Sequence, residues 1–236
     1  MLIMDALPTV RSSTYLSIAK NYGQGGNTIV LAARLYVWNG YLASAVDRAT
    51  GEVEVLLRNY MDVAFADWNS SSPRNGSREW IINPVGVLKE LVVPQKGKPL
   101  MEHAHIESVE GKPVHDDYVA GLTFGNWVHL LPKPFAGENN NRVNLWNEAL
   151  KPNLCQTNPD RVKFQSNAMQ VKNMRNRATH RRPLIKDLEK LEATHQSCVE
   201  IAKSINPQLG EWLRTERWIP NALKECPLKI KDGPSY

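Results

Sequence analysis

The sequence predicts an all-α protein. Apolar residues recur at steps of three and four along several segments, and alternation at a step of two is almost absent. Proline and glycine residues separate these segments, as expected at helix ends. A chain of 236 residues with 42% hydrophobic residues can bury a substantial core. We therefore expect an N-terminal helix and a glycine-rich break at 1–26, one helical domain at 27–218, and a loosely packed tail at 219–236.

Each helix is predicted from its apolar spacing and from the residues at its ends. Ser12 or Ser13 is expected to cap the first helix, which the glycine cluster after Tyr22 ends. Asn27 is expected to open the long apolar helix, and Thr50-Gly51 to end it. In chain order, the expected helices cover 12–21, 27–48, 52–68, 84–92, a short stretch within 93–114, 116–131, 144–150, a helix that Asn158 or Asp160 caps and Pro183 ends, 184–204 and 207–218.

Positive charge is concentrated in one part of the chain. The formal net charge is +5 and the pI is near 9.1. The run from Arg161 to Lys186 holds eight Lys or Arg and no Asp or Glu, so the remaining residues sum to a negative charge. Such concentrated basicity favours an anionic partner, with nucleic acid as the first candidate. A solvated helix face is the simpler alternative.

Several patterns bear on location and on metals. Residues 1–11 lack the pattern of a signal peptide. The most apolar stretch, 29–46, is interrupted by Arg34 and Asn39-Gly40, which favours a buried helix over a membrane span. The three cysteines are far apart, which suits a reducing compartment, so we expect a cytoplasmic protein without membrane contact. His103 and His105 have no obvious third ligand, and we expect no metal and no other cofactor.

The helix that ends at Pro183 carries a candidate site. Arg175 lies almost on its apolar stripe, where a guanidinium requires an anionic partner. Asn176 and His180 are four residues apart and share another face, and His180 is about 140° from Arg175 on a straight helix. Two arrangements can bring Arg175 and His180 together: the helix tightens or ends near Pro183, or two copies of the helix meet in a dimer. The stripe consists of Phe164, Ala168, Val171, Met174 and Ala178.

These residue types suit the cleavage of RNA. His180 can take the proton of a 2′-hydroxyl or give one to the leaving 5′-oxygen. Arg175 can grip the phosphate and stabilise charge in the transition state, and Asn176 can orient the histidine or bind the scissile group. A capped basic helix end explains the same residues without chemistry. The expected contacts to the RNA backbone come from Lys172, Arg177, Arg181, Arg182 and Lys186.

Three stretches resemble the Abi-like (abortive infection) proteins of the HEPN superfamily. Residues 175–180, Arg-Asn-Arg-Ala-Thr-His, are similar to the superfamily signature of an Arg, a polar residue, a short spacer and a His. Residues 52–59 resemble a segment with a glutamate and a Leu-Arg-Asn triplet. Residues 122–127, Leu-Thr-Phe-Gly-Asn-Trp, resemble a Leu-Thr-Phe-Gly-aromatic-Trp segment. Together with the Trp38 helix, the likeness spans roughly residues 30–205.

The resemblance implies a HEPN-type helical bundle with additional helices, a homodimer with the motif at its interface, and a metal-independent endoribonuclease. Such enzymes act in phage defence or as toxins paired with an antitoxin or regulatory protein. By position, Arg175, Asn176 and His180 become catalytic candidates. The supporting candidates are Glu54, Arg58 and Asn59, for which a surface salt bridge between the first two is the alternative.

The chain also departs from the family pattern. Arg181 and Arg182 stand where a second His and a Glu are common, and Asn126 replaces an aromatic residue. The first departure removes a possible second acid or base. Two further hypotheses therefore remain: a non-catalytic module that binds nucleic acid or nucleotides, and a purely structural dimerisation helix.

Overall fold

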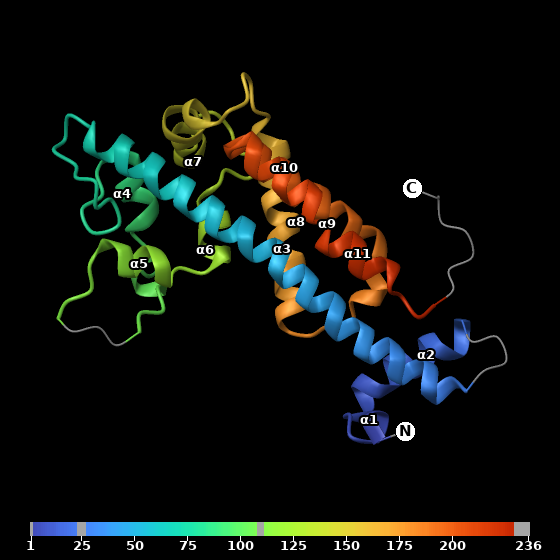
Figure 1. Cartoon of the computed structure of the whole chain (residues 1–236). Coiled ribbons are helices and arrows are strands. Elements are labelled where there is room, and N and C mark those ends of the chain that lie inside the picture. The colour runs from blue at the N-terminus through green and yellow to red at the C-terminus, as the bar shows by residue number, and fades with distance from the viewer. Residues whose placement is uncertain (1, 23–26, 108–110, 229–236) are drawn as a thin grey trace. The chain divides into compact units, whose positions relative to one another are not determined.

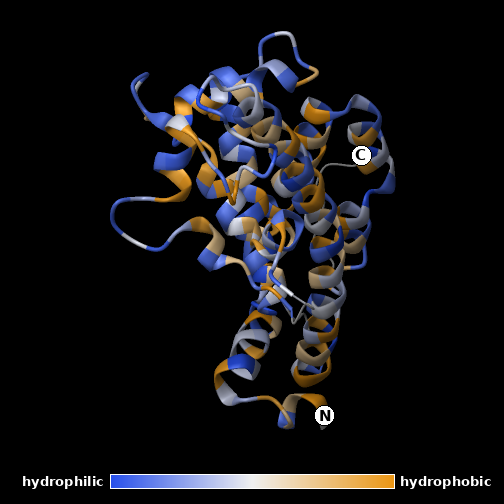
Figure 2. Ribbon diagram, turned by 90° about the vertical axis from the view of Figure 1, so that its left-hand side faces the viewer, coloured by the Kyte–Doolittle hydropathy of each residue, from blue (hydrophilic) through white to orange (hydrophobic). Residues whose placement is uncertain are grey.

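The computed structural model describes residues 2–22, 27–107 and 111–228, and every regular element in these ranges is a helix (Figure 1). The prediction of an all-α fold is confirmed. Apolar and polar residues alternate around the helices, as expected where one side of each helix packs against others (Figure 2). The predicted glycine break at 23–26 lies outside the described residues.

The longest helix, α3 (Thr28–Ser70), runs through the point where a break was expected. Asn27 caps it as predicted, since its Oδ1 accepts hydrogen bonds from the amides of Ile29 and Val30 at 3.0 and 3.3 Å. The predicted end at Thr50-Gly51 is wrong. A single glycine costs a helix only about 1 kcal/mol, and the buried stripe continues past it through Val46, Ala49, Val53 and Leu57.

By length and composition α3 is also long and apolar enough to cross a membrane. This is weak support for a membrane span, because the core helix of a soluble protein passes the same test. The helix carries a buried stripe, but Val37 and Val63 on other faces are more than half exposed. The cellular location therefore remains a prediction.

The chain divides into two compact units, which we describe separately. The first comprises the described parts of 1–49, 174–195 and 217–236. It contains α1 (Leu2–Asp5), α2 (Thr9–Tyr22), the first part of α3, the end of α8 (Arg161–Thr179), η4 (Leu184–Asp187), the start of α9 (Leu188–Ile205) and α11 (Trp218–Lys224). The buried ring of Tyr15 and the half-buried ring of Tyr36 meet edge to face with their centroids 5.6 Å apart, which joins α2 to α3.

The C-terminal helix α11 was not predicted, and the expectation of a loose tail is wrong for 219–224. Ile219 and Ala222 are fully buried. The indole N–H of Trp38 donates to the carbonyl of Ala222 at 2.8 Å, and the guanidinium of Arg48 lies 4.4 Å from the ring centre of Trp218. These contacts anchor the short helix against α3 despite its internal proline.

The second unit comprises 50–173 and 196–216. It contains the rest of α3, α8 and α9, and adds α4 (Gly86–Val92), η1 (Leu100–His103), α5 (His115–Gly121), α6 (Phe124–Leu130), α7 (Asn141–Leu145), the π-helical turn η2 (Trp146–Leu150), η3 (Lys151–Asn153) and α10 (Pro207–Glu216). Its core includes Trp80, whose ring centroid lies 5.3 Å from that of Phe65 and 6.0 Å from that of Trp127.

The helix expected at 116–131 is instead two helices, α5 and α6. Leu122 is extended, and Thr123 caps α6 by accepting a hydrogen bond from the amide of Asn126 on its hydroxyl. The amide of Thr123 in turn donates to Oδ1 of Asn126 at 3.0 Å. Thr123 and Asn126 thus form a capping box. Because the two residues are only three positions apart, the local sequence determines this helix start.

Candidate functional site

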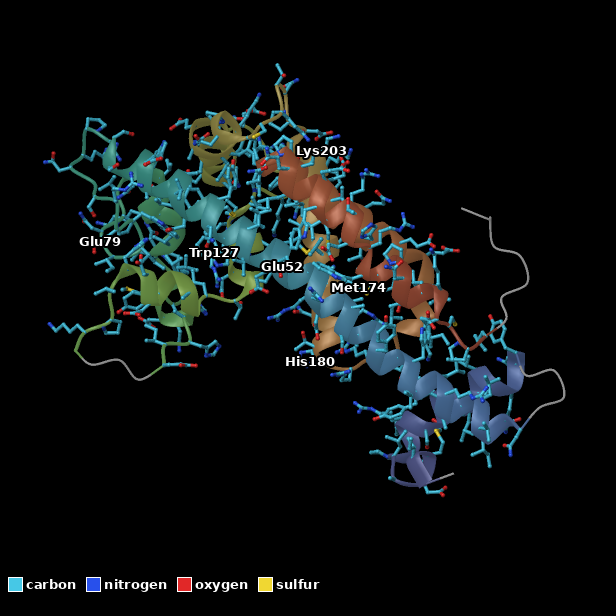
Figure 3. All side chains as sticks on the ribbon, viewed as in Figure 1. Glu52, Glu79, Trp127, Met174, His180 and Lys203 are labelled. Atoms are coloured by element: carbon cyan, nitrogen blue, oxygen red, sulfur yellow. The ribbon has the colours of Figure 1, made fainter. Side chains whose placement is uncertain are left out.

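The candidate site lies at the C-terminal end of α8, whose start and buried face follow the prediction. Asp160 rather than Asn158 caps the helix, since its carboxylate accepts from the amides of Val162 and Lys163 at 2.8 and 3.1 Å. The predicted stripe is confirmed, because all five of its members are buried: Phe164, Ala168, Val171, Met174 and Ala178. Figure 3 shows Met174 on α8 and His180 at the end of that helix.

The helix ends within the motif, before Pro183. The amide of Arg181 donates to the carbonyl of Ala178 at 2.8 Å, and that of Arg182 donates to Arg177 at 2.9 Å. These are the two hydrogen bonds of a Schellman motif, with Arg181 in the left-handed conformation at φ +50°. His180 is therefore the C-cap residue, and its side chain is exposed. Residues of the motif and the two arginines that follow it thus form the C-terminal end of α8.

Arg181 occupies a backbone conformation that costs a non-glycine residue about 1–2 kcal/mol. Its guanidinium donates to the carbonyl of Gly40 on α3 at 2.9 Å, which helps to hold it there. A glycine is the usual residue at this position of a Schellman motif. Arg181 therefore has a structural role at the end of α8.

The three catalytic candidates differ in exposure. Arg175 is half-buried, and its Nη1 lies 3.5 Å from Oδ1 of Asn176. Asn176 and His180 are exposed. One helix end thus presents a guanidinium, an amide and an imidazole within six residues. The half-buried position of Arg175 agrees with its predicted place beside the apolar stripe.

Asp47 of α3 is a neighbour of the motif that the sequence did not reveal. The Thr179 hydroxyl lies 3.0 Å from Oδ1 of Asp47 and 3.0 Å from the carbonyl of Arg175. A carboxylate therefore contacts Thr179, the residue that precedes His180 in the chain. Asp47 is separated from Thr179 by 132 positions, and no spacing rule connects such residues.

Asn39 of α3 holds the segment that follows His180. Its side-chain amide donates to the carbonyl of Arg182 at 3.3 Å, and its Oδ1 accepts from the amide of Leu184 at 2.7 Å. Asn39 and Leu184 are both buried. In the sequence Asn39 only interrupts an apolar stretch, whereas in the structure its side chain anchors the chain after the motif.

The five predicted RNA-binding residues divide into three groups. Arg177 forms an ion pair with Asp187 and donates to the carbonyl of Pro183 at 3.3 Å, and Arg181 binds Gly40 as described. Arg182 and Lys186 are exposed, and within the described residues their side chains form no hydrogen bond or ion pair. Lys172 belongs to the second unit. Their role in RNA binding remains a prediction.

The supporting candidates Glu54, Arg58 and Asn59 lie on the part of α3 that belongs to the second unit. Arg58 is half-buried and donates to the carbonyl of Ala120 at 3.3 Å. This bond links α3 to α5 within that unit. The catalytic candidates belong to the first unit, so a joint role of the two sets stays a prediction.

The second unit also holds a partly buried polar cluster that the sequence did not reveal. Asp62 accepts hydrogen bonds on Oδ1 from the indole of Trp80 at 2.7 Å and from Nε2 of His115 at 2.9 Å. Asp62 and His115 line an open pocket of about 270 Å³, together with Glu79 and Asp116. Nδ1 of His115 is buried and has no hydrogen-bond partner among the residues that the structure describes. Within the described residues, no three His, Cys, Asp or Glu are grouped as metal ligands.

Comparison with protein-family models, with curated proteins and with solved structures gives no match to this chain. The functional assignment therefore rests on the motif at the end of α8 and on its surroundings.

Proposed function

We propose that the protein is a metal-independent endoribonuclease of the HEPN type, acting in the cytoplasm in phage defence or as a toxin. The observation that carries the proposal is the exposed His180 at the C-cap of α8, with Arg175 and Asn176 on the preceding turn and a half. An exposed imidazole and a guanidinium on the same helix end are suited to general acid–base work on a phosphodiester.

In the proposed reaction, His180 takes the proton of the ribose 2′-hydroxyl, and the 2′-oxygen forms a bond to phosphorus. The bond from phosphorus to the 5′-oxygen breaks, and that oxygen takes up a proton. The products are a 2′,3′-cyclic phosphate and a free 5′-hydroxyl. Arg175 neutralises the charge that develops on the phosphoryl oxygens, and Asn176 hydrogen-bonds the scissile group or orients His180.

The homodimer is part of the proposal. A second copy of the same helix end would supply a second imidazole, so that one His180 removes a proton while its counterpart donates one. This division of roles compensates for Arg181 and Arg182, which replace the family's further His and Glu. An antitoxin or other regulatory protein would then act by covering this helix end.

The test is cleavage of RNA by the full chain and by the His180→Ala variant. We expect the variant to lose at least about 100-fold in rate, since general acid–base groups contribute about 10²–10⁴. The wild-type products should carry 2′,3′-cyclic phosphate and 5′-hydroxyl ends. His105→Ala, which removes another exposed histidine, is the matched control and should retain full activity.

Three results would contradict parts of the proposal. Equal cleavage by wild type and His180→Ala would remove the catalytic role of His180. Loss of activity on addition of a chelator would exclude the metal-independent mechanism. A monomer at micromolar concentration in light scattering would exclude the composite site. If the wild type binds RNA and leaves it intact, a binding module is the correct description.

A further inference from the structure

Phe135 is fully exposed, at 101% of its reference area. It lies in the connection 131–140 between α6 and α7 of the second unit (Figure 1). Burial of a phenylalanine side chain stabilises a fold by about 1.5–3 kcal/mol, and the exposed ring of Phe135 contributes none of this stabilisation. One exposed apolar residue is ordinary by itself. Whether Phe135 forms a binding site therefore depends on the turn that carries it and on the charged side chains nearby.

The turn that carries Phe135 is held in place from α8. The amide of Ala136 donates to the carbonyl of Lys133 at 3.0 Å, which closes a turn over Lys133–Ala136. The half-buried guanidinium of Arg161 donates to the carbonyls of Lys133 and Ala136 at 3.0 and 3.4 Å. Pro132 and Pro134 restrict the backbone further. The ring is therefore presented on an ordered turn, which lowers the entropy cost of binding through it.

Positive side chains from separate elements surround His129, at the end of α6. Arg142 of α7 donates to the carbonyl of His129 at 2.7 Å and approaches its Nε2 at 3.0 Å. Because a guanidinium only donates, Nε2 accepts and the imidazole is neutral with its proton on Nδ1. Burial, followed by the charges of Arg142, Lys133, His103 and Lys172, lowers the pKa of His129.

We define the Phe135 surface as Phe135, Lys133, His129, Arg142 and Lys172, all of which belong to the second unit. Its cations come from the connection, α7 and α8. Glu138 is the sole acidic residue of the connection 131–140. Lys172 was predicted to bind RNA as part of the motif helix, and its charge acts on His129. An exposed aromatic ring beside basic side chains is the combination that binds single-stranded nucleic acid.

We propose that the Phe135 surface binds single-stranded RNA, with one base stacked on Phe135 and the flanking phosphates held by Lys133, Arg142 and Lys172. The inference rests on RNA being the substrate, as proposed above, and adds a binding site outside the unit that carries the cleavage motif. Stacking on an aromatic ring accepts any base, so we expect binding with little sequence preference. Each phosphate contact adds to the salt dependence of the affinity.

The experiment measures the Kd of a labelled single-stranded RNA of about 12 nucleotides by fluorescence anisotropy. The full chain is used in a His180→Ala background, so that the RNA stays intact. Phe135→Ala should weaken binding roughly 5- to 100-fold, which corresponds to the loss of one stacked base. Phe135→Leu retains an apolar side chain without an aromatic face and should weaken binding almost as much. Phe135→Trp should bind at least as well as the parent.

The remaining variants separate charge from general damage. Lys133→Ala and Lys172→Ala should each lower the slope of log Kd against log salt by about 1. Val114→Ala, a control at another exposed apolar residue of the same unit, should leave Kd unchanged. The Phe135 variants should have the same Tm as the parent protein, because the exposed ring makes no packing contacts that a substitution could remove.

Full affinity of Phe135→Leu would overturn the stacking interaction, and full affinity of Phe135→Ala would overturn the surface altogether. A change of oligomeric state in Phe135→Ala would reassign the ring to contact between copies and also overturn the inference. The two proposals fail in different ways. If only the proposed ribonuclease function is wrong, the wild type binds RNA through Phe135 and leaves it uncut. If only the Phe135 surface is wrong, Phe135→Ala cleaves RNA at the full rate.

Discussion

Asn39→Ala should destabilise the first unit through two hydrogen bonds that hold the chain after the motif. The amide of Leu184 loses its acceptor, Oδ1 of Asn39, which lies at 2.7 Å. Since Leu184 is fully buried, water cannot replace that acceptor, and the unsatisfied group costs about 1–3 kcal/mol. The lost bond to the carbonyl of Arg182, at 3.3 Å, adds about 0.5–1.5 kcal/mol. Together they lower the free energy of unfolding by about 2–4 kcal/mol.

Thermal unfolding followed by circular dichroism measures this effect. For a chain of this size, 1 kcal/mol shifts Tm by about 2–4 °C, so the expected decrease is about 5–15 °C. Ser44→Ala is the matched control, because it removes a hydrogen bond to Gly40 from an exposed position of the same helix. Its effect should stay within about 0.5 kcal/mol.

The reasoning would be refuted if Asn39→Ala and Ser44→Ala had the same Tm. The turn after the motif would then be held by other contacts, and Asn39 would not position it.

Two further predictions concern buried polar groups. Asp62→Ala leaves the buried indole N–H of Trp80 without its acceptor, so chemical denaturation should show a loss of about 1–3 kcal/mol; Asp67→Ala breaks only an exposed ion pair and should cost under about 1 kcal/mol. Burial and the positive charge of Arg217 lower the pKa of His195, so below its ordinary value of about 6.5 the unfolded chain takes up a proton that the folded chain refuses. Stability should therefore fall as pH decreases from about 7 to 5, and the decrease should be smaller in His195→Gln; an equal decrease would show that His195 titrates normally in the fold.

Local patterns explain which helices were predicted correctly. The cap at Asn27, the cap at Asp160 and the buried stripe of α8 depend on residues within a few positions of each other, so periodicity and capping rules identify them. The same rules fail where packing outweighs propensity. Gly51 did not end α3, because the buried stripe continues on both sides of it.

The candidate site shows a similar division. Arg175, Asn176 and His180 are recognisable in the sequence because they lie within six residues. The surrounding residues are not, since Asp47 lies 132 positions from Thr179, and Asn39 lies 145 positions from Leu184. Their meeting depends on how α3 packs against the end of α8, and side chains on different helices share no spacing.

The sequence by itself determined that the protein is helical, that its positive charge is concentrated between Arg161 and Lys186, and that one helix carries an Arg, an Asn and a His in a recognisable order. These properties follow from local periodicity and composition. Only the tertiary structure decided that Arg181 sits in a left-handed Schellman turn bound to Gly40, and that Phe135 stands fully exposed on a turn held by Arg161. The physical reason is that burial and hydrogen-bond partners depend on residues distant in the chain.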